Sequence, residues 1–149
     1  MKKIAVTLVL IAAALMVSTA LFANDRAAAV QGMVERAVDL VKAEGKEDAF
    51  RAINDLEGPF VVGDIYLFAI SLDGVSLAEG SPNNKPLLGK NISSDPAVAK
   101  MIELAKAKGS GWVNYSWTKP GEKDPTPKRS FIKRVPGQDF FIGCGYYLK

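Results

Sequence analysis

The sequence has 149 residues, one cysteine, no histidine and a formal net charge of +3. Without histidine, neither a Ser-His-Asp triad nor a Cys-His pair can form, and zinc loses its commonest protein ligand. A single cysteine excludes an intrachain disulfide, a CxxC redox pair and a cysteine-rich metal site. These absences exclude many classes of enzyme, and the length is that of one domain.

Residues 1–23 have the pattern of an export signal. Lys2 and Lys3 precede an apolar run, Ile4–Val17, and small residues follow as far as Ala23. We therefore predict a signal peptide over 1–23, a mature domain over 24–149, and a periplasmic or secreted location. An uncleaved membrane anchor stays open, because about 20 residues at roughly 1.5 Å each can span a bilayer. Without the two leader lysines, 19 − 2 = 17 basic residues face 16 acidic ones, and this balance argues against a nucleic-acid partner.

Two helices are predicted at the start of the mature chain. The first covers Ala27–Lys42 and carries a buried stripe at helical spacing, made of Val30, Val34, Ala37 and Val41. The second begins near Glu47, places Phe50, Ile53 and Leu56 on one side, and stops at Gly58-Pro59. The stripe is explained by packing on the rest of the domain, but the first helix could also pair with a second copy to form a homodimer.

Strand signals follow. The apolar segment Ile65–Ile70 predicts a central strand, and Asp73-Gly74 turns the chain into a second strand at Val75–Ala78. Residues 80–91 read as a loop because they are rich in Ser, Pro and Asn. Ser94 or Asp95 then caps a helix that begins at Pro96.

Three more strands close the chain, at 112–117, 130–135 and 140–147, with a Gly/Pro-rich excursion at 119–127. Because consecutive hairpins make antiparallel sheets, the order of elements predicts an α+β fold. We expect a five-stranded antiparallel sheet with a long N-terminal helix and further helices packed on it.

Several short segments, taken in order, carry a resemblance to a known family: Gly63–Tyr66, Leu72–Val75, Leu88–Asn91, Gly111–Trp117 with Pro120, Lys128–Phe131 and Ile142–Tyr147. With these segments the mature chain resembles the single-Cache family, the PAS-like extracellular sensor domains of bacterial chemoreceptors and sensor kinases. Two departures bear on ligand choice. Glu79 and Gly80 stand where the family commonly has a His-containing stretch, and Phe131 replaces the usual Tyr. No second apolar span or signalling module follows, so we expect a membrane sensor kinase or chemoreceptor as the signalling partner.

Candidate ligand contacts lie on three strands. In the strand 112–117, Val113, Tyr115 and Trp117 share one face, and Trp112 lies on the other with Asn114 and Ser116. These rings could be core, but aromatic residues alternating with hydroxyls and amides also box small polar ligands.

Lys128 and Ser130 share a face of the next strand, because strand side chains alternate. The resemblance implies that Lys128 lines the pocket, and a ligand carboxylate would supply the anion that a buried ammonium needs. Ser130 and Tyr66 would donate hydrogen bonds to it. The predicted ligand-binding residues are therefore Tyr66, Trp112, Tyr115, Trp117, Lys128 and Ser130.

The function that follows is an exported sensor domain that binds a small organic acid or a similar metabolite. The main alternative is an interaction or structural module with a vestigial pocket. An enzyme ranks last, since no nucleophile–base or metal constellation is visible, and we expect no catalytic residue, metal or cofactor. Cys144 lies in an apolar strand, which indicates a buried small hydrophobe rather than a reactive thiol.

Overall fold

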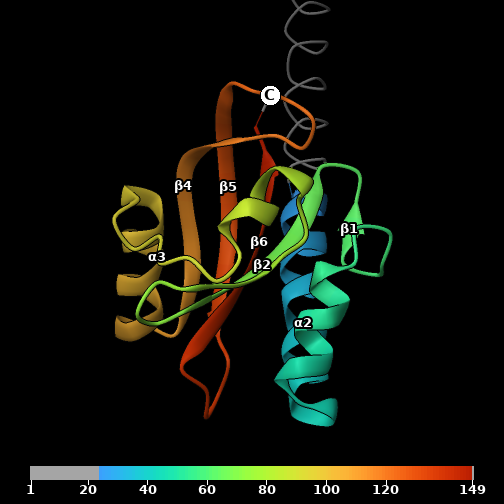
Figure 1. Ribbon diagram of the computed structural model, residues 1–149, viewed down its shortest axis with the longest axis vertical. Helices are drawn as coiled ribbons and strands as arrows, with labels where there is room; N and C mark the ends of the chain where they lie inside the picture. The colour runs from blue at the N-terminus through green and yellow to red at the C-terminus, as the bar shows by residue number, and fades with distance from the viewer. Residues whose placement is uncertain (1–23, 149) are drawn as a thin grey trace, which may run out of the picture.

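The computed structural model describes residues 24–148, in which one antiparallel sheet has helices on both faces (Figure 1). The predicted leader, residues 1–23, lies outside the described residues. Among the helices that the structure describes, none combines the length and the apolar character of a membrane span.

The sheet has the strand order β1-β2-β6-β5-β4, and β3 pairs with β2. The strands are β1 (Val61–Val62), β2 (Ile65–Ser71), β3 (Ser76–Glu79), β4 (Ser110–Thr118), β5 (Pro125–Arg134) and β6 (Phe140–Tyr147). The five predicted strands are all present, which confirms the α+β prediction. The sixth, β1, was missed because two residues are too few to show an alternating pattern.

One face of the sheet is covered by two helices, the N-terminal helix over 24–44 and α2 (Lys46–Asn54). The predicted stripe of the first helix is buried, and Val30, Val34 and Ala37 are completely so. Packing on the sheet therefore accounts for the stripe, and a homodimer through this helix stays a prediction. Leu56 does not join this face as predicted, because α2 ends at Asn54 and the leucine follows in a turn with 39% of its surface exposed.

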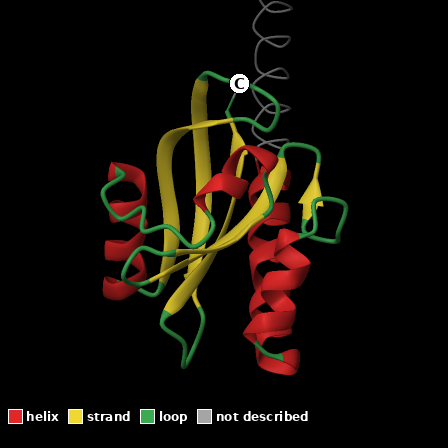
Figure 2. Cartoon of the chain, in the orientation of Figure 1, coloured by secondary structure: helices red, strands yellow, loops and turns green. Residues whose placement is uncertain are grey.

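The opposite face is covered by α3 (Pro96–Ala107) and the short 3₁₀ helix η1 (Pro82–Leu87), as Figure 2 shows. Asp95 caps α3 as predicted, because its Oδ1 accepts hydrogen bonds from the backbone N–H groups of Ala97 and Val98. The η1 turn lies in the segment predicted as a loop. Its backbone holds Asn84 in a buried position, although most of the segment is exposed or half-buried.

The start of β5 differs from the prediction in a way that matters for the site. The strand begins at Pro125, five residues before the predicted Ser130, so Lys128 lies inside the sheet. Its cross-strand neighbours are Tyr115 on β4 and Tyr147 on β6. The chain therefore places a lysine between two tyrosines in the middle of the sheet.

Candidate functional site

A cavity lies between the sheet and the η1–α3 layer, and the volume open to the centre of a water-sized sphere inside it is about 20 Å³. A volume of this order holds about one water molecule. Its walls come from β2, β3, β4, β5, η1, α3 and the loop before α3. The lining residues are Tyr66, Phe68, Ile70, Glu79, Asn84, Ile92, Val98, Met101, Tyr115, Trp117 and Lys128.

Lys128 is the cation of the cavity and is only 1% exposed. Its Nζ lies 4.0 Å from the ring centroid of Tyr66 and 5.0 Å from that of Tyr147, with Phe68 and Tyr115 at 5.7 and 6.0 Å. Rings at these distances attract a cation but do not neutralise it. Within residues 24–148 no carboxylate lies within 4 Å of this ammonium. Burial lowers the pKa of Lys128 to about 8.

A glycine behind Lys128 makes room for its side chain. Gly145 on β6 pairs with Ser130 on β5, and a Cβ built on it would lie 2.9 Å from Cε of Lys128. Such a Cβ would also come too close to the hydroxyl of Ser130. Any larger residue at position 145 would therefore push the lysine and the serine from their places.

Glu79 gives the cavity a carboxyl group that is nearly as buried as the lysine, at 2% exposure. Its Oε1 accepts a hydrogen bond from Ser76 Oγ at 2.8 Å, and its Oε2 accepts one from Asn84 Nδ2 at 3.1 Å. Removal from water disfavours the ionised carboxylate and raises its pKa to about 7, although both hydrogen bonds and the charge of Lys128 act in the opposite direction.

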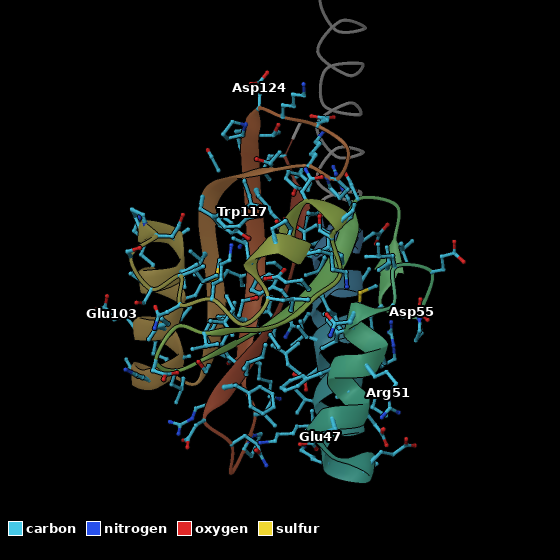
Figure 3. All side chains as sticks on the ribbon, viewed as in Figure 1. Glu47, Arg51, Asp55, Glu103, Trp117 and Asp124 are labelled. Atoms are coloured by element: carbon cyan, nitrogen blue, oxygen red, sulfur yellow. The ribbon has the colours of Figure 1, made fainter. Side chains whose placement is uncertain are left out.

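Asn84 connects the η1 cover to the walls of the cavity. Its Oδ1 accepts a hydrogen bond from Trp117 Nε1 at 3.1 Å, and its Nδ2 lies 3.4 Å from the hydroxyl of Tyr66. The neighbouring Asn83 donates to the backbone oxygens of Lys119 and Glu122 in the β4–β5 loop. Figure 3 shows Trp117 beside η1. Two consecutive asparagines thus connect η1 by hydrogen bonds to β4 and to the loop that follows β4.

Four of the six predicted ligand contacts lie together in the cavity: Tyr66, Tyr115, Trp117 and Lys128. Ser130 lies behind this wall and is fully buried, and its Oγ and the hydroxyl of Tyr115 form a 2.8 Å hydrogen bond. Ser130 therefore orients Tyr115 and does not itself line the cavity.

Trp112 lies apart from the cavity. It packs against the core on the face covered by the N-terminal helix and α2, 5.4 Å from Phe131 and 6.2 Å from Tyr146 between ring centroids. The guanidinium of Arg129 stacks on it at 4.7 Å. Because it lies an odd number of residues from Tyr115 and Trp117, strand alternation turns it away from their cavity. The structure therefore does not bring Trp112 together with the other predicted ligand contacts.

Sequence reasoning missed Asn84 and the apolar lining from Ile92, Val98 and Met101. Glu79 stood out only as a departure from the family pattern, and Asn84 lay in the segment predicted as a loop. No local pattern marks either residue, because β3 and η1 bring them to the cavity through a turn and a loop.

Cys144 is fully buried, as predicted, on the face covered by the N-terminal helix and α2, and its Sγ lies 3.8 Å from Met33 Sδ. Burial raises the pKa of its thiol to about 12, so the thiolate is suppressed. Over residues 24–148, no group of three His, Cys, Asp or Glu side chains is placed to hold a metal ion.

Several solved structures share this arrangement. A periplasmic sensor domain of a chemotaxis protein is 25% identical, with a TM-score of 0.67 over 86% of this chain and 98% of that one. A Cache chemosensory domain, solved to explain carboxylic acid recognition, is also 25% identical, with a TM-score of 0.68 over 88% and 96% of the two chains. A methyl-accepting chemotaxis protein from Vibrio parahaemolyticus shares the fold at 19% identity, with a TM-score of 0.72 over 91% and 97%.

Comparison of the sequence with known proteins gives a short match to one chemotaxis protein and a long match to one protein family. The methyl-accepting chemotaxis protein McpP of Pseudomonas putida is 39% identical over 49 residues, which are 33% of this chain and 9% of that protein. The model of the Cache domain matches residues 23–149. The helix-flanked antiparallel sheet, the cavity on one face and this match over most of the sequence lead to one conclusion: the chain belongs to the Cache domain family and is a ligand-binding sensor domain.

Proposed function

We propose that this domain binds a small carboxylic acid, with its carboxylate against the ammonium of Lys128. The observation that carries the proposal is that ammonium, buried among aromatic rings and, within residues 24–148, without a carboxylate partner. A buried cation costs several kcal/mol unless an anion accompanies it. A ligand carboxylate would supply that anion and accept charge-assisted hydrogen bonds from Nζ.

The other walls favour a short acid. Phe68, Ile70 and Met101 make part of the lining apolar, which suits an alkyl chain. The ring of Tyr66 lies under the lysine, 4.0 Å from Nζ to its centroid, and its hydroxyl would be a further donor to a bound carboxylate. The volume of the cavity, about 20 Å³ for the centre of a water-sized sphere, favours the smallest ligands of this class. These are acids of two to four carbons, and their few atoms limit the Kd to about micromolar or weaker.

The test is titration calorimetry of the purified chain with acetate, propionate and lactate. We expect binding to wild type, and Lys128→Met should weaken it at least about 30-fold, since truncating a desolvated charge pair costs roughly 2–5 kcal/mol. Lys100→Met is the matched control, because Lys100 is exposed on α3 and should leave the Kd unchanged. Equal affinity of the Lys128→Met and wild-type proteins would remove the proposal. A protein that binds no small molecule would instead favour an interaction module with a vestigial pocket.

We further propose that the domain works outside the inner membrane and signals through a chemoreceptor or a sensor kinase. The support is the predicted export signal at 1–23 and the similarity to a periplasmic sensor domain of a chemotaxis protein. Intact-mass analysis of the expressed protein should show a mature chain that begins at Asn24. Recovery of residues 1–149 in the membrane fraction would show an uncleaved anchor instead.

A further inference from the structure

Two oppositely charged side chains face the same cavity without forming an ion pair. Lys128 reaches it from β5 and Glu79 from β3, and both are nearly completely buried. None of the ion pairs within residues 24–148 joins them, so their charged atoms are more than 4 Å apart. A ligand in the cavity would therefore meet both groups.

The two groups differ in what the protein already gives them. Each oxygen of Glu79 accepts a hydrogen bond, one from Ser76 and one from Asn84. The ammonium of Lys128 has aromatic rings around it and, within the described residues, no carboxylate within 4 Å. Glu79 therefore has its hydrogen-bond partners already, whereas the ammonium still lacks an anion in contact with it, which favours a simple carboxylate over a zwitterion.

Charge balance then constrains the bound state. An ammonium and a carboxylate make the empty cavity neutral, and a second carboxylate would leave one negative charge without a partner in a place with little water. Such a charge is far costlier than a neutral carboxylic acid. Protonation of Glu79 restores neutrality, and the hydroxyl of Ser76 can rotate to accept the new O–H.

We propose that Glu79 takes up one proton from solvent when a carboxylate binds to Lys128, so that this domain binds an acid as an anion together with a proton. The proposal rests on the proposed function, because it requires the carboxylate at Lys128. The proton adds to one carboxyl oxygen of Glu79 and no covalent bond is broken. Glu79 thereby sets how affinity depends on pH.

The ionisable groups around Glu79 leave it free to act in this way. Lys128 on β5 and Lys85 on η1 are the cations that act on it, and Lys85 is held by a 2.6 Å hydrogen bond to the backbone oxygen of Asn54. The hydroxyls of Tyr66 and Tyr115 face it from β2 and β4, and burial raises the pKa of both so far that they stay neutral. With the pKa of Glu79 raised to about 7 and that of Lys128 lowered to about 8, Glu79 is the group that changes charge near neutral pH.

The test measures the Kd for propionate at pH 6 and pH 8 at constant ionic strength, in wild type, Glu79→Gln and Glu103→Gln. We expect the wild-type affinity to fall about 20-fold, since Glu79 loses its proton over this range and Lys128 is half deprotonated at the upper end. The affinity of Glu79→Gln should fall only about twofold between pH 6 and pH 8, because Lys128 is then the only one of the two groups that still titrates. Glu103 is exposed on the outer side of α3 (Figure 3), and its variant should keep the wild-type pH dependence.

A second measurement needs no variant. Calorimetry of the wild-type protein with propionate at pH 7, in buffers of different ionisation enthalpy, should show uptake of about half a proton per ligand, because Glu79 is then half ionised. Binding without proton uptake, or an unchanged pH dependence in Glu79→Gln, would overturn this inference and leave the proposed function intact. Failure of wild type to bind any small acid between pH 5 and 8 would overturn both. Binding only of amino acids, lost in Glu79→Gln, would make Glu79 an ammonium partner and overturn the proton uptake.

Discussion

Trp117 on β4 donates a hydrogen bond from Nε1 to Oδ1 of Asn84 on η1, at 3.1 Å and across 33 residues of sequence. The same amide donates from Nδ2 to Glu79 at 3.1 Å. Asn84 thus connects an aromatic wall of the cavity to its buried carboxyl group. The η1 helix and the walls of the cavity are therefore joined by hydrogen bonds.

Replacing Asn84 should damage both stability and binding. Asn84→Ala leaves Trp117 Nε1 and one oxygen of Glu79 without their partners, and each buried polar group left unpaired costs about 1–3 kcal/mol. We expect urea unfolding to show a loss of about 2 kcal/mol or more, and the Kd for a bound acid to rise. Asn114→Ala on the exposed side of β4 is the control and should stay within about 0.5 kcal/mol. Equal stability of the two variants would mean that Asn84 does not hold the cover.

Without ligand, removing the charge of Lys128 should stabilise the fold. Burial lowers the pKa of this lysine to about 8, so below pH 8 the folded protein holds a cation that the unfolded chain holds more easily in water. Lys128→Met keeps the length of the side chain and should raise the free energy of unfolding at pH 7 by about 1–3 kcal/mol. The gain is less than the full desolvation cost of the ammonium, because the aromatic rings already offset part of that cost in wild type. Urea unfolding measures it, with Lys100→Met as the exposed control. A destabilised Lys128→Met would show that the lysine supports the fold even without ligand.

The stability of the empty protein should fall between about pH 4.5 and pH 7 because of Glu79. Its pKa rises from 4.5 to about 7 on folding, so over this range the folded state binds more protons than the unfolded state, and rising pH favours unfolding. The loss attributable to Glu79 is on the order of 3 kcal/mol. Between pH 4.5 and pH 7, the free energy of unfolding measured with urea should fall by this much more in wild type than in Glu79→Gln. An equal change in the two proteins would place Glu79 in contact with water.

Gly145 should tolerate no side chain. A Cβ there would lie 2.6 Å from the backbone oxygen of Arg129 and 2.9 Å from Cε of Lys128. Gly145→Ala is therefore expected to lose at least about 2 kcal/mol of stability by overpacking, together with acid binding. Gly32→Ala is the matched control, since its nearest neighbour is a flexible Arg36 side chain at 3.9 Å and alanine favours a helix by about 0.5–1 kcal/mol. Similar stabilities of the two variants would contradict the tight packing behind Lys128.

Most elements were predictable because their signals are local. Asp95 and Pro96 mark the start of α3, and Asp73-Gly74 marks the turn between β2 and β3, since capping and turn formation depend on a few adjacent residues. β1 and η1 were missed, as the first is only two residues long and the second lies in a segment whose composition is that of a loop.

The aromatic residues and the lysine of the cavity were partly predictable from the sequence. Its carboxyl group, on Glu79, and its amide, on Asn84, were not. Strand alternation placed Tyr115 with Trp117, and the family resemblance indicated Lys128. Alternation also turns Trp112 to the other face, where it packs on Phe131. Glu79 and Asn84 come to the cavity only because β3 folds back on β2 and η1 closes over it. The sequence by itself determined the elements and the faces of the strands, because these follow from short-range periodicity. The tertiary structure alone decided that the buried ammonium and the buried carboxyl group share one cavity, because that depends on which strands pair and on how a loop packs.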